Sequence, residues 1–342
     1  MSECRYYHVE TGQGLRRVDD LANALACRQR GGYIWLDLQD PTRGEMDALA
    51  KPLGIHPLAV EDCLDEDQVP KIEDYPGHIL ILFNRYTYAQ RELAVAEVDF
   101  LLGTNFLVTV NRDGPTARRT FGKIEEMASL DIPTVEKGPD YLLHVILDHT
   151  VDGKLEAIEA IEDDIEMAEE GMLEDAATFR LVDLVHLRRA LLSLRKSLFH
   201  EREILVKICR KDSPFITEPA IYHFRDIYDH LTKFFEFTEM NRDILTSLTE
   251  TYLSLVNNRM ADVSNRTNRS VRRLTLITTV FMPLTLLAGI GGMSEWSMMT
   301  GPHNWRVAYP LFILGMSGIG AINYVLLRWV ERKRGDRPAD RS

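Results

Sequence analysis

The feature that most constrains this sequence is a pair of apolar runs near its C-terminus. Neither Leu274 to Ser294 nor Val307 to Leu327 contains an Asp, Glu, Lys or Arg, although 27% of the 342 residues are charged. Each run is about twenty residues long, which as a helix spans the ~30 Å hydrocarbon core of a bilayer. The sequence therefore predicts a membrane protein with two transmembrane helices and most of its mass outside the bilayer.

The charges that flank these runs predict how the helices are oriented. The connection at 295–306 carries a single acid, Glu295, with His303 and Arg306. Basic residues stand before the first run and after the second: Arg266, Arg269, Arg272 and Arg273, then Arg328, Arg332, Lys333 and Arg334. By the positive-inside rule both termini are cytoplasmic, in an inner (plasma) membrane. A hairpin that serves only as an anchor is an alternative.

Composition excludes several classes of protein. Forty basic against 52 acidic residues give a net charge of -12, which disfavours a nucleic-acid partner. The four cysteines show no C-x-x-C spacing, so neither a disulfide framework nor a cysteine zinc site is expected. The chain shows no P-loop, nucleophile elbow or metal-hydrolase spacing and is not expected to be an enzyme. The first residues, MSECRYYHVE, lack the apolar core of a signal peptide.

Residues 1–135 have the pattern of an α/β domain. Tyr33 to Leu38 reads as a strand, and Thr42 with Glu45 forms a capping box that opens a helix ending near Gly54. Further strands are predicted at 78–88 and at 95–110, the latter broken by a turn at 103–105. The carboxylates and histidine of the segment that begins at His56 are interpreted as a helix end and a solvated loop.

Residues 136–218 are predicted to be helical from Pro139 to about Ile208. The stretch from Asp152 to Asp175 is acidic except for Lys154, and the stretch at 180–211 is mainly basic. Such opposite charges suit two antiparallel helices that lie against each other or against neighbouring subunits. The acidic stretch either concentrates cations near a pore mouth or is simply a solvated face.

A stalk helix is predicted from 219 into the first apolar run. No glycine or proline occurs between Pro219 and Pro283, so a single helix of ~95 Å is the economical interpretation. Two consecutive heptads of similar pattern, beginning at Val256 and Val263, bring Asn, Ser and Thr close to the membrane. Polar residues on such a repeat favour a face toward water or a symmetry axis.

One face of the first run continues this spacing. It carries small, hydroxylated and apolar residues at Thr267, Val271, Leu274, Thr278, Met282, Thr285 and Gly289. Simple packing between helices is an alternative explanation for such a stripe. Pro283 leaves the carbonyl of Thr279 without its helical donor, which favours a watery face.

Several segments together resemble the CorA family of divalent metal ion transporters over nearly the whole chain. They are HPLAVEDCLDEDQVPKIEDYP (56–76), GTNFLVTV (103–110), GPDYLLHVILDHTVD (138–152), FRDIYDH (224–230), YLSLVNNRM (252–260) and FMPLTLLAGIGGMS (281–294). The resemblance implies an α+β membrane protein: an N-terminal α/β cytoplasmic domain, a long helical stalk (219–273) and a two-helix transmembrane hairpin (274–294 and 307–330) with a basic cytoplasmic tail (331–342). It further implies a homopentameric funnel whose first spans surround the pore.

The resemblance also assigns roles to residues. The family's Gly-Met-Asn filter appears here as Gly292, Met293 and Ser294, and Gly291 stands where a tyrosine is common. Glu295 would form an acidic ring at the outer mouth. The stripe described above becomes the pore lining, with hydrophobic constrictions at two of its members, Leu274 and Met282.

For regulation, the resemblance implies a cytoplasmic metal-sensing role for Asp226. Its usual partner is missing, because Ala89 stands where an aspartate can occur. Sensing is therefore expected to be weaker, or to rely on other carboxylates such as Asp229 or Glu92. A salt bridge from Asp226 to a nearby arginine is the structural alternative.

The resulting hypothesis is a channel-like transporter of hydrated magnesium, with cobalt and nickel as further candidates, gated by intracellular divalent ions. The first span offers no carboxylate or imidazole to replace the waters of magnesium, so the ion would keep its hydration shell. Magnesium is the expected transported and regulatory ion, and no organic cofactor is expected. The alternatives are a zinc transporter of the ZntB type and a non-conducting membrane scaffold or sensor.

Overall fold

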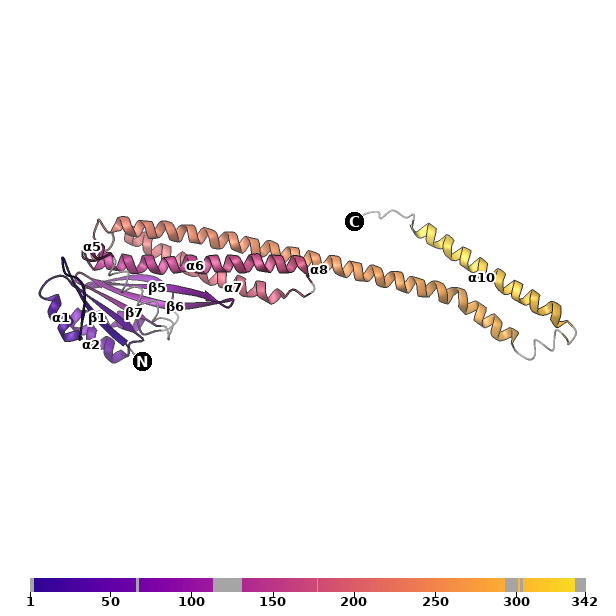
Figure 1. The fold of residues 1–342 in the computed structure, drawn as a ribbon, viewed down its shortest axis with the longest axis horizontal. Coiled ribbons are helices and arrows are strands. Elements are labelled where there is room, and N and C mark those ends of the chain that lie inside the picture. Colours follow the sequence, from indigo (N-terminus) through magenta and orange to yellow (C-terminus); the bar gives the residue numbers. More distant parts are fainter. Residues whose placement is uncertain are drawn as a thin grey trace. The chain divides into compact units, whose positions relative to one another are not determined.

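The computed structural model describes residues 3–65, 68–112, 131–176, 178–292, 301 and 304–335. The chain divides into two compact units, Met1–Tyr252 and Leu253–Ser342. The first contains a β-sheet and most of the helices, and the second contains the two apolar runs (Figure 1).

The first unit is built on a seven-stranded sheet of order β2-β1-β3-β7-β6-β5-β4. Strand β3 pairs with β7 in parallel, and the other neighbours pair antiparallel. The strands are β1 (Glu3–Glu10), β2 (Gly14–Val18), β3 (Tyr33–Gln39), β4 (Lys71–Tyr75), β5 (His78–Ala89), β6 (Glu92–Gly103) and β7 (Phe106–Asn111). The strands predicted at 33–38, 78–88 and 95–110 are thus confirmed, the last as β6 and β7.

Helices cover both faces of the sheet. Helices α1 (Leu21–Arg28), α2 (Arg43–Leu53) and α3 (Pro57–Asp62) lie on one face, and α6 (Pro139–Glu174) lies on the other, preceded by the single turn α5 (Ile132–Val135) (Figure 1). Alternate residues of β3 therefore enter two different cores. Ile34, Leu36 and Leu38 pack with Met46 and Leu49 of α2 in the first.

The predicted capping box fixes where α2 begins. The Thr42 hydroxyl accepts from the Glu45 amide at 3.4 Å, and the Glu45 carboxylate accepts from the Thr42 amide at 2.7 Å. Gly54 ends the helix at φ 70°, a left-handed conformation that glycine adopts without steric cost.

Helix α6 is followed by the antiparallel helix α7 (Leu181–Cys209), which also packs on β4, β5 and β6. A buried ion pair joins these helices, and each of its members has the opposite charge to the stretch in which it lies. Lys154, the exception in the acidic stretch, donates to Glu201, an acid in the basic stretch, at 3.0 Å, and both side chains are fully buried. Most carboxylates of the acidic stretch are instead exposed in one chain.

Helix α8 (Ile221–Gly291) is continuous over 71 residues and passes through Pro283, which confirms the predicted uninterrupted helix. Its buried positions end at Leu248. Helix α10 (Trp305–Gly335) follows. In the part of the chain that the structure describes, two helical segments are long and apolar enough to cross a membrane, one within α8 and one at Arg306–Leu326.

Candidate functional site

The predicted pore-lining residues lie on one face of α8. Thr278, Met282, Thr285 and Gly289 line a shallow groove of about 740 Å³ together with their neighbours Ile277, Phe281, Leu286 and Ile290. The remaining members, Thr267, Val271 and Leu274, extend the face toward the N-terminus of the helix at spacings of three and four residues.

This face is uncovered in a single chain. The side chains of Leu274 and Met282 are 65% and 67% exposed, although both are large and apolar. In a membrane-spanning helix such a face must be covered by lipid or by other copies of the chain, and its hydroxyl groups distinguish it from a purely lipid-facing surface.

The threonine hydroxyls on this face are oriented by the helix itself. Thr278 Oγ1 donates to the Leu274 carbonyl at 2.9 Å, and Thr285 Oγ1 donates to the Phe281 carbonyl at 2.9 Å. Each hydroxyl hydrogen is thus used within the helix, and the oxygen lone pairs remain available as acceptors. The face offers oxygen acceptors, which suits the hydrogens of water around a cation.

Pro283 has no amide hydrogen to donate to the Thr279 carbonyl. The Thr279 carbonyl therefore receives no hydrogen bond from residue 283. The hydroxyl of Thr279 is itself used elsewhere, since it donates to the Thr275 carbonyl at 2.8 Å. One backbone acceptor therefore lies beside the groove-lining Met282 without its helical donor, as the sequence predicted.

At the end of α8, Gly291 allows close packing of α10. A Cβ atom at Gly291 would lie 2.6 Å from Cζ of Phe312, closer than any real contact. At the position where the family commonly has a tyrosine, a side chain would therefore require this ring to move. Gly292 follows, with its amide donating to the Ala288 carbonyl at 3.0 Å. Met293, Ser294, Glu295 and His303 lie outside the described residues.

Asp226 lies on the exposed side of α8, near α6. The charge of Asp226 affects the pKa values of two side chains of α6, His144 and Asp148. Burial and nearby His223 lower the pKa of His144 to about 4, and Asp226 opposes this decrease. Burial raises the pKa of Asp148, and Asp226 adds to the increase. Among the described residues no arginine or lysine pairs with Asp226 within 4 Å, so the salt-bridge alternative is not observed there.

A single chain does not bring Asp226 together with the predicted partners on the β5–β6 hairpin. Asp226 lies near residues 144–148 of α6, whereas Arg91, between Ala89 and Glu92, contacts Asp164 of the same helix. Sixteen residues of helix separate Asp148 from Asp164, about 24 Å at 1.5 Å per residue. Asp229 is exposed on α8. Within the described ranges, no group of three or more His, Cys, Asp or Glu side chains is arranged to hold a metal ion.

Comparison with known proteins decides the family. The sequence pattern of the family described as CorA-like Mg2+ transporter protein matches residues 30–333. The chain belongs to this family. The resemblance found in the sequence is thereby confirmed.

Two relatives within the CorA family show how far the similarity extends. The chain is 31% identical over 317 residues to the cobalt/magnesium transport protein CorA of Thermotoga maritima, covering 91% of this chain and 87% of the relative. It is 27% identical over 285 residues to the protein of the same name from Methanocaldococcus jannaschii, covering 82% of this chain and 86% of the relative.

Solved structures confirm the fold. The complete CorA magnesium transporter from Methanocaldococcus jannaschii matches with a TM-score of 0.72 at 22% identity, over 96% of this chain and 97% of that one. The cytoplasmic domain of ZntB from Vibrio parahaemolyticus matches with a TM-score of 0.57 at 10% identity, over 74% and 98%. At such identities the likeness concerns the fold alone, so it does not separate magnesium from zinc.

Sequence reasoning missed two arrangements. Phe312 carries no motif of its own, and only its contact with Gly291 gives it a role. The ion pairs of Arg91 were also missed. The strands were predicted at 78–88 and 95–110, with six residues between them, whereas in the structure only Gln90 and Arg91 separate β5 from β6 in a tight hairpin turn.

Proposed function

We propose that this protein conducts hydrated magnesium across a membrane, along an axis surrounded by the α8 helices of several copies. The supporting observation is the uncovered α8 face, on which Thr278, Met282, Thr285 and Gly289 form one groove. Its hydroxyl oxygens suit the outer face of a hydration shell, and magnesium releases its own waters reluctantly. Membership in the CorA-like family agrees with this chemistry.

The assembly is a homopentamer, with both termini cytoplasmic in the inner (plasma) membrane. Five copies turn the α8 stripe into a closed wall and cover its apolar members. Leu274 and Met282 then form rings that narrow the path, and Gly292, Met293 and Ser294 form the filter at the outer end, followed by a ring of Glu295. Cobalt and nickel share this path, whereas a zinc transporter of the ZntB type is the alternative.

Conduction is reduced by intracellular divalent ions that bind Asp226 against carboxylates of a neighbouring copy. Asp226 is exposed and lies beside Asp148, whose pKa is raised by burial and by this neighbouring charge. A site of like charges attracts a divalent cation, and Asp229 or Glu92 completes it in place of Ala89.

Flux in sealed proteoliposomes tests the conduction path. Thr285→Val removes a hydroxyl from the groove, and Thr279→Val is the matched control on the same helix, since its side chain does not line the groove. We expect magnesium flux to fall about tenfold in Thr285→Val and to change little in Thr279→Val. Equal flux in the two variants, or zinc flux that requires a pH gradient and exceeds that of magnesium, would refute the proposal.

A further inference from the structure

The turn between β5 and β6 has an unusual backbone. Ala89 pairs with Glu92, so Gln90 and Arg91 form a two-residue loop. Both have positive φ, 54° and 65°. This is the geometry of a type I′ turn, in which Asn-Gly is preferred because the left-handed conformation is unfavourable for residues with a Cβ atom. A turn with two such residues calls for an interaction that holds it.

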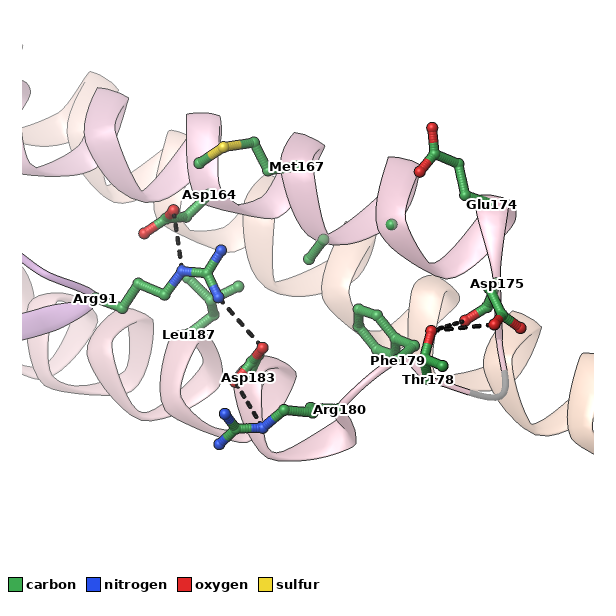
Figure 2. A pocket seen from close by; sticks show the side chains of 12 residues that line it. Arg91, Asp164, Met167, Glu174, Asp175, Thr178, Phe179, Arg180, Asp183 and Leu187 are labelled. Atoms are coloured by element: carbon green, nitrogen blue, oxygen red, sulfur yellow. Dashed lines mark hydrogen bonds and ion pairs between the residues drawn. The ribbon is translucent and has the colours of Figure 1, made fainter.

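Arg91 supplies that interaction. Figure 2 shows its guanidinium between Asp164 of α6 and Asp183 of α7. Arg91 Nε lies 3.5 Å from Asp164 Oδ1, and Nη1 lies 3.2 Å from Asp183 Oδ2. The other oxygen of Asp164 accepts from the Tyr88 hydroxyl at 2.6 Å, so the same hairpin contacts this carboxylate twice. One planar group thereby joins three elements.

Arg91, Asp164 and Asp183 line a surface pocket, so their contacts are exposed to solvent on one side. The pocket is also lined by Met167, Phe179 and Leu187, with Arg180 near Asp183 (Figure 2). Arg91 is 51% exposed, whereas Asp164 and Asp183 are 11% and 26% exposed. Two partly buried carboxylates face the Arg91 guanidinium, which water and salt can still reach, and Arg180 Nε also lies 4.0 Å from Asp183 Oδ1.

We propose that Arg91 is a built-in cation that straps the β5–β6 hairpin to α6 and α7, and so keeps this corner of the Met1–Tyr252 unit closed without a divalent ion. The guanidinium lies between two carboxylates from different helices and contacts both. Because it is half-exposed, the strap is loosened by ionic strength and not by magnesium as such. It operates whether or not the protein conducts ions.

Two glycine variants of the full-length protein separate the strap from the strain of the turn. Gln90→Gly and Arg91→Gly each place glycine at a left-handed position, so each relieves a similar backbone strain. Only Arg91→Gly removes the guanidinium. Arg91→Lys keeps the charge but cannot contact both carboxylates through one planar group.

Hydrogen exchange of the hairpin amides in detergent-solubilised protein is the measurement. We expect exchange at 88–93 to be about five- to tenfold faster in Arg91→Gly than in Gln90→Gly, with Arg91→Lys between them. Sodium chloride should accelerate exchange of these amides in the wild type. Magnesium chloride at the same ionic strength should accelerate it by the same factor. Unchanged exchange in the buried part of α8 controls for loss of the fold.

The proposal is overturned if Arg91→Gly and Gln90→Gly exchange equally fast. It is also overturned if magnesium slows exchange in the wild type relative to sodium chloride at matched ionic strength, because the corner would then close on a divalent ion. Neither result depends on transport, so the outcome is independent of the proposed function.

Discussion

The ring of Phe312 in α10 lies directly over Gly291 at the end of α8, at a distance that leaves no room for a Cβ atom. Helix α8 ends at this glycine, and Gly292, the first residue of the proposed filter, comes next. The second transmembrane segment therefore fixes the helix end that precedes the filter, and the two positions should be mutationally coupled.

Gly291→Ala should destabilise this contact, because the methyl group overlaps Phe312. Overpacking of this kind costs about 1–3 kcal/mol. We expect a lower apparent melting temperature and reduced flux, both partly restored by adding Phe312→Ala. A double variant that is as impaired as the sum of the two single variants would show that the residues do not interact.

The buried pair of Lys154 and Glu201 should be essential for the first unit. Burial lowers the pKa of Lys154, which is fully buried beneath the rings of Phe83 and Tyr86, each 4.8 Å from Nζ. Lys154→Met leaves the Glu201 charge buried without its partner and should cost about 3–5 kcal/mol. Lys154→Met combined with Glu201→Met should cost less than Lys154→Met alone. Thermal unfolding of the wild type, the single variant and the double variant gives the order of their stabilities.

Stability should fall as pH decreases from 6.5 to 4 because of His78. This side chain is fully buried and stacks on Tyr75 with ring centroids 4.9 Å apart. Burial, with a smaller contribution from His56, lowers its pKa from 6.5 to about 4. The unfolded chain binds the proton more readily in this interval, so folding loses up to about 3 kcal/mol on acidification. His78→Leu should reduce the pH dependence of the melting temperature, and the remaining dependence is expected from His144, whose pKa is also lowered to about 4. His186→Leu, at an exposed histidine, should leave it unchanged.

Met282 should limit the rate of conduction. Met282→Ala widens the proposed ring and removes an apolar barrier to water, so magnesium flux should rise about threefold or more. Leu287→Ala is the control, because it removes similar bulk from the opposite side of α8. Leu287 comes nine residues after Thr278, which is two and a half helical turns. Leu287→Ala should not raise flux. Faster flux in both variants would point to loosened packing and not to a pore constriction.

Asp226→Asn should weaken inhibition by internal magnesium. Loss of one charge from the proposed sensing site should raise the half-inhibitory magnesium concentration about fivefold or more. The comparison is Glu250→Gln, an exposed acid on the same helix. Flux into vesicles preloaded with graded magnesium measures the shift. An unchanged inhibition curve would place the sensor elsewhere.

Local patterns predicted the elements whose causes are local. The capping box at Thr42, the strands at 33–38 and 78–88 and the uninterrupted α8 follow from neighbouring residues. The contacts of Lys154 could not be predicted, because its partner Glu201 is 47 positions away in a stretch of opposite average charge. The same limit applies to Gly291 and Phe312, where a long-range contact and not the local sequence decides what fits. The roles of Met293 and Ser294 in the filter, and of Glu295 at the outer mouth, stay predictions from the resemblance.

The hydroxyls of Thr278 and Thr285 have a final consequence for coupling. Their hydrogens are held by carbonyls of their own helix, so these groups can accept a hydrogen bond from passing water but have no free hydrogen to hand onward. A proton cannot hop along such a row while both bonds persist. These two hydroxyls therefore do not relay protons, and coupling of ion movement to protons would have to run through water or through other groups.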